Sequence, residues 1–195
     1  MSVPPNPSPF DQPAVMAPFA YPLDEFYSMA KRELPALEQV DGDDIPQPYR
    51  QLLVHNEDMT PTLEKFHDER IYLNVISRQH RGDFYFREVI LLTQRKRLPV
   101  EFGAIKMNLT LFPAGAKRLI LEEREPLGTI LSEFKIPHAS RPKAFLRIHA
   151  DSFIKGALQL SGEQVLYGRR NTLFDPQQRA LAEIVEILPL ADEPS

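Results

Sequence analysis

The sequence predicts an α+β protein built on a mainly antiparallel, twisted sheet of about six strands with flanking helices. Apolar residues recur with helical spacing in the first third of the chain and with a period of two after His67. Short polar segments such as RQHRGD and RKR separate the strand-like runs, and connections this short join antiparallel neighbours. The runs do not alternate regularly with helices, so we do not expect a nucleotide-binding βαβ fold.

The first twenty residues are unusually rich in proline. Seven of the chain's 19 prolines fall within its first 22 residues. Because proline fixes φ and has no backbone donor, such a segment forms neither a helix nor a central strand. We therefore expect residues 1–20 to be a flexible arm, with the alternative that its aromatic side chains pin it to the domain. Residues 21–195 are expected to form a single domain.

Four segments have the apolar spacing of amphipathic helices. The first of them is ended by Pro35. In the third, Thr60 is placed as the N-cap residue, with Pro61 at the first helical position. The predicted helices cover residues 23–34, 48–56, 57–67 and 126–134.

The predicted strands are rich in β-branched and aromatic residues and show period-two alternation. They fall into two hairpin-rich groups, with the last predicted helix between the groups. The six segments cover residues 69–78, 83–94, 99–112, 143–152, 163–174 and 179–189.

Composition excludes several classes of function. The 195 residues include no cysteine, which rules out disulfides, thiolate metal sites and a cysteine nucleophile. The five histidines lack metal-binding spacing and no glycine-rich phosphate loop is present, so we expect neither metal nor cofactor. A net charge of −4 argues against a nucleic-acid partner. Without a secretory signal or the ~18 apolar residues of a membrane helix, a cytoplasmic protein is expected.

An arginine lies inside one of the most apolar predicted strands. Arg87 shares a strand face with Val89 and Leu91. A guanidinium on an apolar face needs an anionic partner, because burying an isolated charge is costly. That partner is either a glutamate of the fold or the carboxylate of a ligand.

Charged residues also interrupt the last two predicted strands. Arg169 and Arg170 point to opposite faces, as do Glu183 and Glu186. An arginine and a glutamate facing into one apolar sheet suit a small anionic ligand that also carries a hydroxyl group. The alternatives are a buried ion pair within the fold, or edge-strand charges that keep the sheet soluble.

Four segments in this order resemble the chorismate pyruvate-lyase family and the broader chorismate lyase-like group. An apolar pair precedes an acidic-Met-Thr helix start in LLVHNEDMTPTLEKFH, and FREVILL resembles an Arg-Glu-aliphatic strand. A Pro-Leu-Gly helix start occurs in EPLGTIL, and an aromatic-Gly-Arg-Arg strand in LYGRRNTLF. The resemblance extends over about residues 50 to 190.

This resemblance implies a twisted antiparallel sheet that encloses a ligand cavity under helical flaps. It also implies cofactor-free elimination of pyruvate from chorismate, which leaves 4-hydroxybenzoate. By position, Arg87 would bind the ring carboxylate, and the backbone of Met59 would contribute to the same group. Leu127 would cap the cavity near the hydroxyl end, and Arg169 is a further candidate for substrate binding.

The last strand departs from the family pattern, in which an acid lies four residues before a proline. Here Pro189 places Val185 at that position. Glu183 shares a face with Val185 and is the preferred catalytic acid, while Glu186 fits only if a bulge reverses the parity. The candidate catalytic residues are therefore Arg87, Glu183 and Glu186.

Two functions follow from these observations. The first is a lyase that cleaves chorismate to pyruvate and a hydroxybenzoate, with a related carboxylate-acting lyase or isomerase as a variant. The second is a non-catalytic protein of the same fold that binds a small aromatic carboxylate. Effector-binding domains of some bacterial regulators resemble this fold too, but they follow a basic winged DNA-binding domain. The 50-odd residues before the resemblance are short, acidic and proline-rich, so we expect no such domain.

Overall fold

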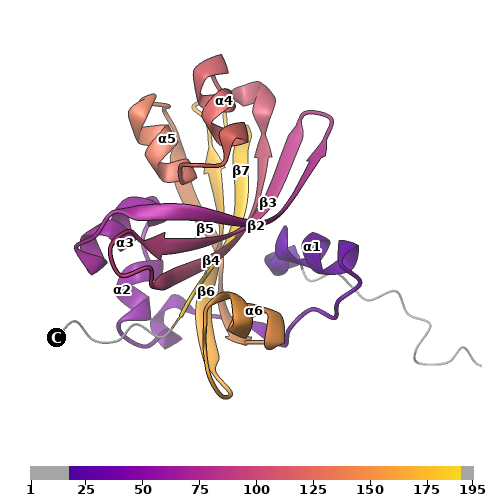
Figure 1. Cartoon of the computed structure of the whole chain (residues 1–195), viewed down its shortest axis with the longest axis vertical. Coiled ribbons are helices and arrows are strands. Elements are labelled where there is room, and N and C mark those ends of the chain that lie inside the picture. Colours follow the sequence, from indigo (N-terminus) through magenta and orange to yellow (C-terminus); the bar gives the residue numbers. More distant parts are fainter. Residues whose placement is uncertain (1–17, 190–195) are drawn as a thin grey trace, which may run out of the picture.

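The structure, a computed structural model, describes residues 18–189 and contains a seven-stranded antiparallel sheet (Figure 1). The strands are β1 (Leu37–Val40), β2 (Ile71–Arg81), β3 (Phe84–Thr93), β4 (Pro99–Asn108), β5 (Ala139–His149), β6 (Val165–Phe174) and β7 (Ala180–Leu188). Their order in the sheet is β1-β5-β6-β7-β4-β3-β2. The predicted α+β class and antiparallel sheet are confirmed, with seven strands in place of about six.

Strands β3, β4, β6 and β7 lie within predicted segments, whereas β2 runs three residues past its predicted end and β5 begins four residues before its predicted start. Strand β1 is the addition. It has only four residues, two of them exposed, so its side chains show no clear alternation. Backbone pairing with β5 holds it at the sheet edge, with Leu37 opposite Ile148. The third predicted strand is shorter than expected, because Leu109–Leu111 turns into a 3-10 helix after the Asn108 side chain accepts a hydrogen bond from the Thr110 amide.

Six α-helices accompany the sheet in the described part of the chain. They are α1 (Leu23–Met29), α2 (Tyr49–Leu53), α3 (Met59–His67), α4 (Ala114–Glu122), α5 (Leu127–Glu133) and α6 (Ser152–Ala157). The helices α4 and α6 were not predicted. The predicted start of α3 was wrong: Asp58 is the N-cap residue, so Thr60 and Pro61 lie inside the first turn. Proline is tolerated there because the first backbone N–H groups of a helix have no intrahelical acceptor.

The boundary between the predicted arm and the domain lies before residue 20. Pro18–Ala20 forms a 3-10 helix, Ala20 is buried and Phe19 packs against the core. The remainder of the predicted arm, residues 1–17, lies outside the described residues. Within residues 18–189, no helix is long and apolar enough to cross a membrane.

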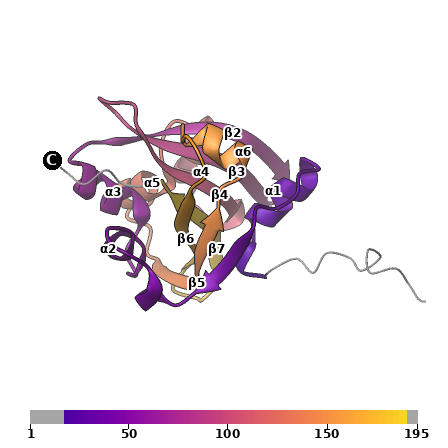
Figure 2. The ribbon, with the colours of Figure 1, turned by 90° about the horizontal axis from the view of Figure 1, so that it is seen from below.

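The two faces of the sheet are covered by different helices. Helices α1 and α6 pack on one face, over a core that includes Phe102 and Val185. Helices α2 and α3 lie on the other side of the molecule from α1 (Figure 2), and α4 and α5 lie together at the top of Figure 1. The second face is buried under α3, α4 and α5, which cover residues such as Val89, Ile105 and Ile184. Alternation along a strand therefore assigns each side chain to one of two distinct cores.

Gly168 in β6 has no room for a side chain, because an added Cβ would collide with the backbone carbonyl oxygen of Glu186. We expect Gly168→Ala to lower the free energy of unfolding by at least about 1–3 kcal/mol, since backbone strands cannot easily move apart. Gly156 is the matched control, because nothing lies within 4 Å of its added Cβ. Gly156→Ala in α6 should raise stability by about 0.5–1 kcal/mol. Urea denaturation of both variants measures this, and equal effects would contradict the assignment.

Candidate functional site

A cavity of about 60 Å³ lies between the second face of the sheet and the starts of α3 and α5. Its walls are mainly aliphatic, with contributions from β2, β3, β4, β6 and β7. The polar and charged side chains among the lining residues are Asp58, Thr60, Arg87, Glu101, Asn171 and Glu186. The volume is small beside the roughly 300–1,000 Å³ of common ligand pockets, so a ring-sized occupant requires the covering helices to move outward.

Three rows of residues cross the sheet beneath the cavity, and all of their members except Arg169 line it. The first row, in the order β3, β4, β7 and β6, is Arg87, Ile105, Ile184 and Asn171. The second row is Val89, Gly103, Glu186 and Arg169. The third row contains Leu91 and Glu101. Successive rows are two residues apart along each strand, which is about 6.6 Å.

Arg87 is almost completely buried, with 2% of its surface exposed. Its Nη1 donates one long hydrogen bond of 3.4 Å to the carbonyl oxygen of Ile120, at the end of α4. Its Nε has no partner within residues 18–189. Burial lowers the pKa of Arg87 to about 10, so the guanidinium is still protonated at neutral pH. The cavity thus contains a buried cation whose hydrogen-bonding capacity is largely unused.

The start of α3 faces the same cavity. Met59 and Thr60 are its first residues, and the first intrahelical bond of the helix is donated by the Thr62 amide to the Asp58 carbonyl. The amides of Met59 and Thr60 therefore have no acceptor within α3, and the positive end of the helix dipole lies beside the cavity. Met59, Arg87 and Leu127, three of the sequence-predicted site residues, are brought together here.

Helix α5 touches α3 directly above the cavity. A Cβ added to Gly128 would lie 2.8 Å from Thr60 Oγ1, so a larger residue would push the two helices apart. The two helix starts are thus in contact through a glycine, and together they form the roof of the cavity.

Glu101 is a site residue that the sequence interpretation missed. Its side chain lines the cavity, and its Oε2 has no hydrogen-bond partner among the described residues. Burial raises the pKa of Glu101 well above its ordinary value, the nearby Glu186 carboxylate raises it further, and Arg169 opposes the shift. The signal was present in the sequence: Glu101 shares a strand face with Gly103 and Ile105, as Arg87 does with Val89 and Leu91.

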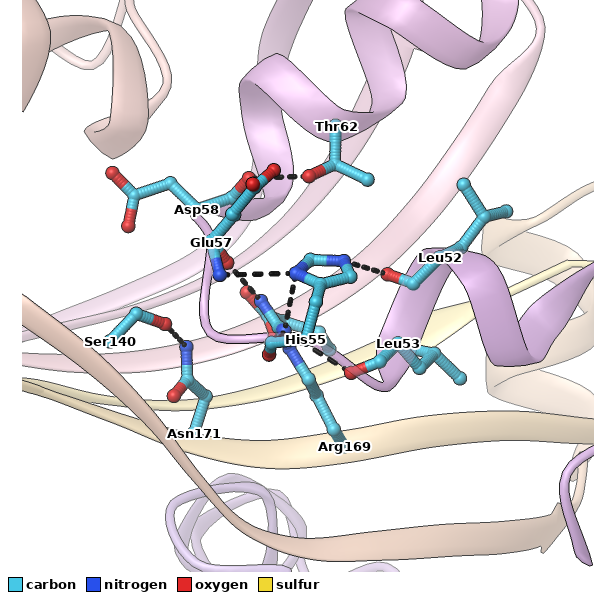
Figure 3. A network of polar contacts seen from close by, with 10 residues as sticks. Leu52, Leu53, His55, Glu57, Asp58, Thr62, Ser140, Arg169 and Asn171 are labelled. Atoms are coloured by element: carbon cyan, nitrogen blue, oxygen red, sulfur yellow. Dashed lines mark hydrogen bonds and ion pairs between the residues drawn. The ribbon is translucent and has the colours of Figure 1, made fainter. Parts of the chain in front are cut away.

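Arg169 was predicted to bind substrate, but the structure uses its guanidinium elsewhere. The Nε forms an ion pair with Glu186. The remaining donors reach the connection between α2 and α3: Nη1 donates to the carbonyl of His55 at 3.0 Å and to that of Leu53 at 3.3 Å, and Nη2 donates to that of Glu57 at 3.0 Å (Figure 3). Arg169 is not among the residues that line the cavity, and it anchors the segment that leads into α3.

The preference for Glu183 as the catalytic acid is corrected by the geometry. Glu183 points to the opposite face of the sheet, where its carboxylate contacts Lys106 at 3.3 Å and Arg170 at 3.2 Å. Glu186 lines the cavity, and no bulge is needed, because the pairing of β4 and β7 is regular through this region. The parity argument separated the two glutamates correctly, but Val185 belongs to the core under α1 rather than to the cavity.

An Asp58–His138 pair lies beside the cavity, which Asp58 lines. The Nε2 of His138 lies 2.9 Å from Asp58 Oδ2, and its Nδ1 lies 2.8 Å from the carbonyl oxygen of Ile136. The pair joins the N-cap of α3 to the segment between α5 and β5. The hydrogen bond with Asp58 raises the pKa of His138, against the opposing effect of burial.

Within residues 18–189, no three histidine, aspartate or glutamate side chains are grouped as metal ligands would be. The polar side-chain groups that line the cavity are one guanidinium, three carboxyls, one amide and one hydroxyl, beside the backbone donors of a helix start.

Comparison with known proteins finds likeness in structure. No family model and no curated protein sequence matches the chain. Gene product SA0254 from Staphylococcus aureus has a TM-score of 0.53 at 9% identity, over 70% of this chain and 90% of that one. PhnF from Mycobacterium smegmatis has a TM-score of 0.52 at 11% identity, over 71% and 66%. The effector domain of PhnF has a TM-score of 0.51 at 10% identity, over 68% and 88%.

At these identities the likeness shows the fold alone. The α+β architecture with its seven-stranded antiparallel sheet is the chorismate lyase-like fold, which the effector domain of PhnF shares, so the predicted fold is confirmed. Membership of the lyase family itself is not supported by any sequence match.

The Asp58–His138 pair predicts a pH dependence of stability. Because the pKa of His138 is raised in the folded state, its contribution is complete below the unfolded value of 6.5 and is lost as pH rises through the folded value. We expect His138→Gln to be less stable than the parent protein by up to about 1 kcal/mol at the acidic end. This deficit should shrink toward zero at alkaline pH.

The measurement is urea denaturation of both proteins between about pH 5 and about pH 9. His149→Gln serves as the control, because His149 is an exposed residue at the end of β5. A deficit of His138→Gln that stays constant across this pH range would refute the ion pair.

Proposed function

We propose that this protein binds a small monocarboxylate in the cavity beneath α3 and α5, with Arg87 as the carboxylate clamp. The observation that carries the proposal is the state of Arg87: it is buried and charged, it faces the cavity, and its Nε has no partner in the described chain. Arg87 forms no ion pair in the described chain, and Glu123 acts on it only at longer range. A bound carboxylate would supply the direct anionic partner that a buried cation needs. A guanidinium also matches a carboxylate geometrically, through two parallel N–H···O bonds.

The start of α3 adds to this preference for an anion. Free backbone amides at a helix N-terminus donate hydrogen bonds and lie at the positive end of the helix dipole. Met59 and Thr60 supply these amides on the roof, while Arg87 lies on the floor. A carboxylate between them is contacted from both sides.

The rest of the ligand would be apolar over most of its surface. Leu73, Leu91, Ile105, Leu131 and Ile184 line the cavity, and they offer an aliphatic wall for a ring or a branched chain. A small aromatic carboxylate such as a hydroxybenzoate fits this description once α3 and α5 part. A solved structure of the same fold is described as an effector domain, which agrees with a binding role.

A lyase is the second candidate, because an arginine, a helix start and an acid line one cavity. The expected residues Met59, Arg87 and Leu127 line the cavity together with Glu186. Elimination of pyruvate from chorismate forms an aromatic ring, so the driving force is intrinsic to the substrate. The protein has only to hold the substrate in a reactive shape and to handle one proton. In this candidate, Glu186 or Glu101 handles the proton.

Replacement of Arg87 separates function from stability. We expect Arg87→Met to weaken the binding of 4-hydroxybenzoate or benzoate by roughly 2–5 kcal/mol, because the clamp is lost. The same variant should not lose stability without ligand, and a gain of up to about 2 kcal/mol is expected, since an uncompensated buried charge is removed. Isothermal titration calorimetry measures the first effect and thermal unfolding the second.

Arg170→Met is the matched control for this experiment. Arg170 is the neighbour of Asn171 in β6, but its side chain points to the opposite face of the sheet, toward Glu183. Its replacement should leave ligand affinity unchanged. If Arg87→Met binds the carboxylates as well as the parent protein does and only its stability falls, Arg87 is a structural residue and the proposal is wrong.

The lyase candidate has a direct assay. The protein is incubated with chorismate, and the release of pyruvate and of a hydroxybenzoate is followed. Stoichiometric formation of both products, lost in Glu186→Gln and retained in Glu183→Gln, would support the lyase. Absence of turnover at micromolar protein would eliminate it and leave the binding role.

A further inference from the structure

Two carboxyl groups lie side by side at the end of the cavity away from Arg87. Glu186 is opposite Gly103 in the β4–β7 pairing, and Glu101 is two residues along β4 on the same face. A methyl group at Gly103 would lie 3.0 Å from Glu101 Oε1, so the Glu101 carboxyl lies over this glycine, which is the residue paired with Glu186. Arg87 is paired with Ile105, four residues along β4 from Glu101, which is about 13 Å of strand.

Within the described chain, only one cationic side chain lies close enough to pair with these two carboxyls. Arg169 forms its ion pair with Glu186, and its other donors bond to backbone carbonyls. Glu101 is left without an ion pair, and its Oε2 has no hydrogen-bond partner among residues 18–189. The other charged side chains that line the cavity are Arg87 on β3 and Asp58 before α3, and Asp58 is engaged by His138.

Two buried carboxylates beside one guanidinium would leave an unpaired buried anion, which is expensive to maintain. Adding one proton removes this cost, because like charges at close range do not both ionise. The raised pKa of Glu101 agrees with this charge balance. Protonated Glu101 is a neutral group with one O–H donor and remaining acceptor capacity.

Resting on the proposed function, we propose that Glu101 and Glu186 share one proton and form the specificity determinant of the cavity, selecting monocarboxylates whose far end carries a neutral hydroxyl group. The carboxylate of the ligand binds Arg87 and the amides of α3. Its hydroxyl group then meets the Glu101 carboxylic acid, and Asn171 Oδ1, which also has no partner among the described residues, is a second acceptor in the same cavity. A second carboxylate is rejected, because it would face Glu186 with no further cation to pair with.

This charge pattern also separates the two candidate functions. Chorismate carries two carboxylates, whereas hydroxybenzoate carries one carboxylate and one hydroxyl group. The cavity as built has one free guanidinium, so it matches the second molecule and not the first.

The shared proton is tested without any ligand. Glutamate side chains are labelled with ¹³C, and the carboxyl resonances are followed by NMR as pH is varied. At neutral pH we expect a protonated glutamate carboxyl resonance that disappears in Glu101→Gln and persists in the control Glu183→Gln; the other buried glutamate with a raised pKa, Glu88, is assigned separately with Glu88→Gln. Finding both Glu101 and Glu186 ionised at neutral pH would overturn the shared proton.

The selectivity is tested with three probes: 4-hydroxybenzoate, benzoate and the dicarboxylate terephthalate. The parent protein should bind 4-hydroxybenzoate at least about fivefold more tightly than benzoate, and terephthalate at least about tenfold more weakly than 4-hydroxybenzoate. In Glu101→Leu the preference for the hydroxyl group should disappear, and Glu101→Gln should restore part of it, because a neutral amide also donates and accepts. Glu183→Leu, on the opposite face, should keep the full preference.

The binding results test the shared proton, the selectivity and the proposed function separately. If Glu101→Gln loses as much discrimination as Glu101→Leu, an ionised Glu101 is required and the shared-proton account is refuted. If terephthalate binds as tightly as 4-hydroxybenzoate, the proposed rejection of a second carboxylate is wrong, while the proposal that Arg87 binds one carboxylate still holds. If none of the three probes binds, the proposed function and the selectivity both fall, and the NMR titration still decides the protonation of the pair.

Discussion

The ion pair between Arg169 and Glu186 connects the middle of the sheet to the roof of the cavity. Its arginine holds three backbone carbonyls in the connection that precedes α3, so the position of the roof depends on a contact made from the floor. Because both charges are buried, loss of either partner would leave the other uncompensated and would also free this connection. The contact that stabilises the fold here also determines where an occupant would meet the start of α3.

The charged groups that line the cavity are spread along the sheet. Arg87 lies in the first row without an ion pair, and Glu186 and Glu101 lie one and two rows away, with Arg169 paired to Glu186. A folded protein does not gain stability from this separation, since buried unpaired charges are costly. Separated charges of this kind are characteristic of sites that are completed by a ligand.

Much of this architecture was readable from alternation within strands. It placed Arg87 on an apolar face and put Glu183 and Glu186 on opposite faces, and the structure bears out both statements. Alternation alone does not say which face the helices of the cavity cover, and for that reason Glu183 was preferred over Glu186. The contacts of Arg169 were also beyond reach, because they are made with carbonyls more than 100 residues away in sequence. Strand β1 and helix α6 have only four and six residues and are defined mainly by what they pack against.

The contact of Gly128 with Thr60 has a kinetic consequence. Opening the roof at this point separates α3 from α5 and involves the Asp58–His138 hydrogen bond, which joins the start of α3 to the segment after α5. Entry and escape of an occupant would then be coupled to this movement. A molecule held beneath such a roof would exchange slowly even if its affinity were modest. Residence time and affinity would thus be set by different residues, the first by the helix contact and the second by the floor.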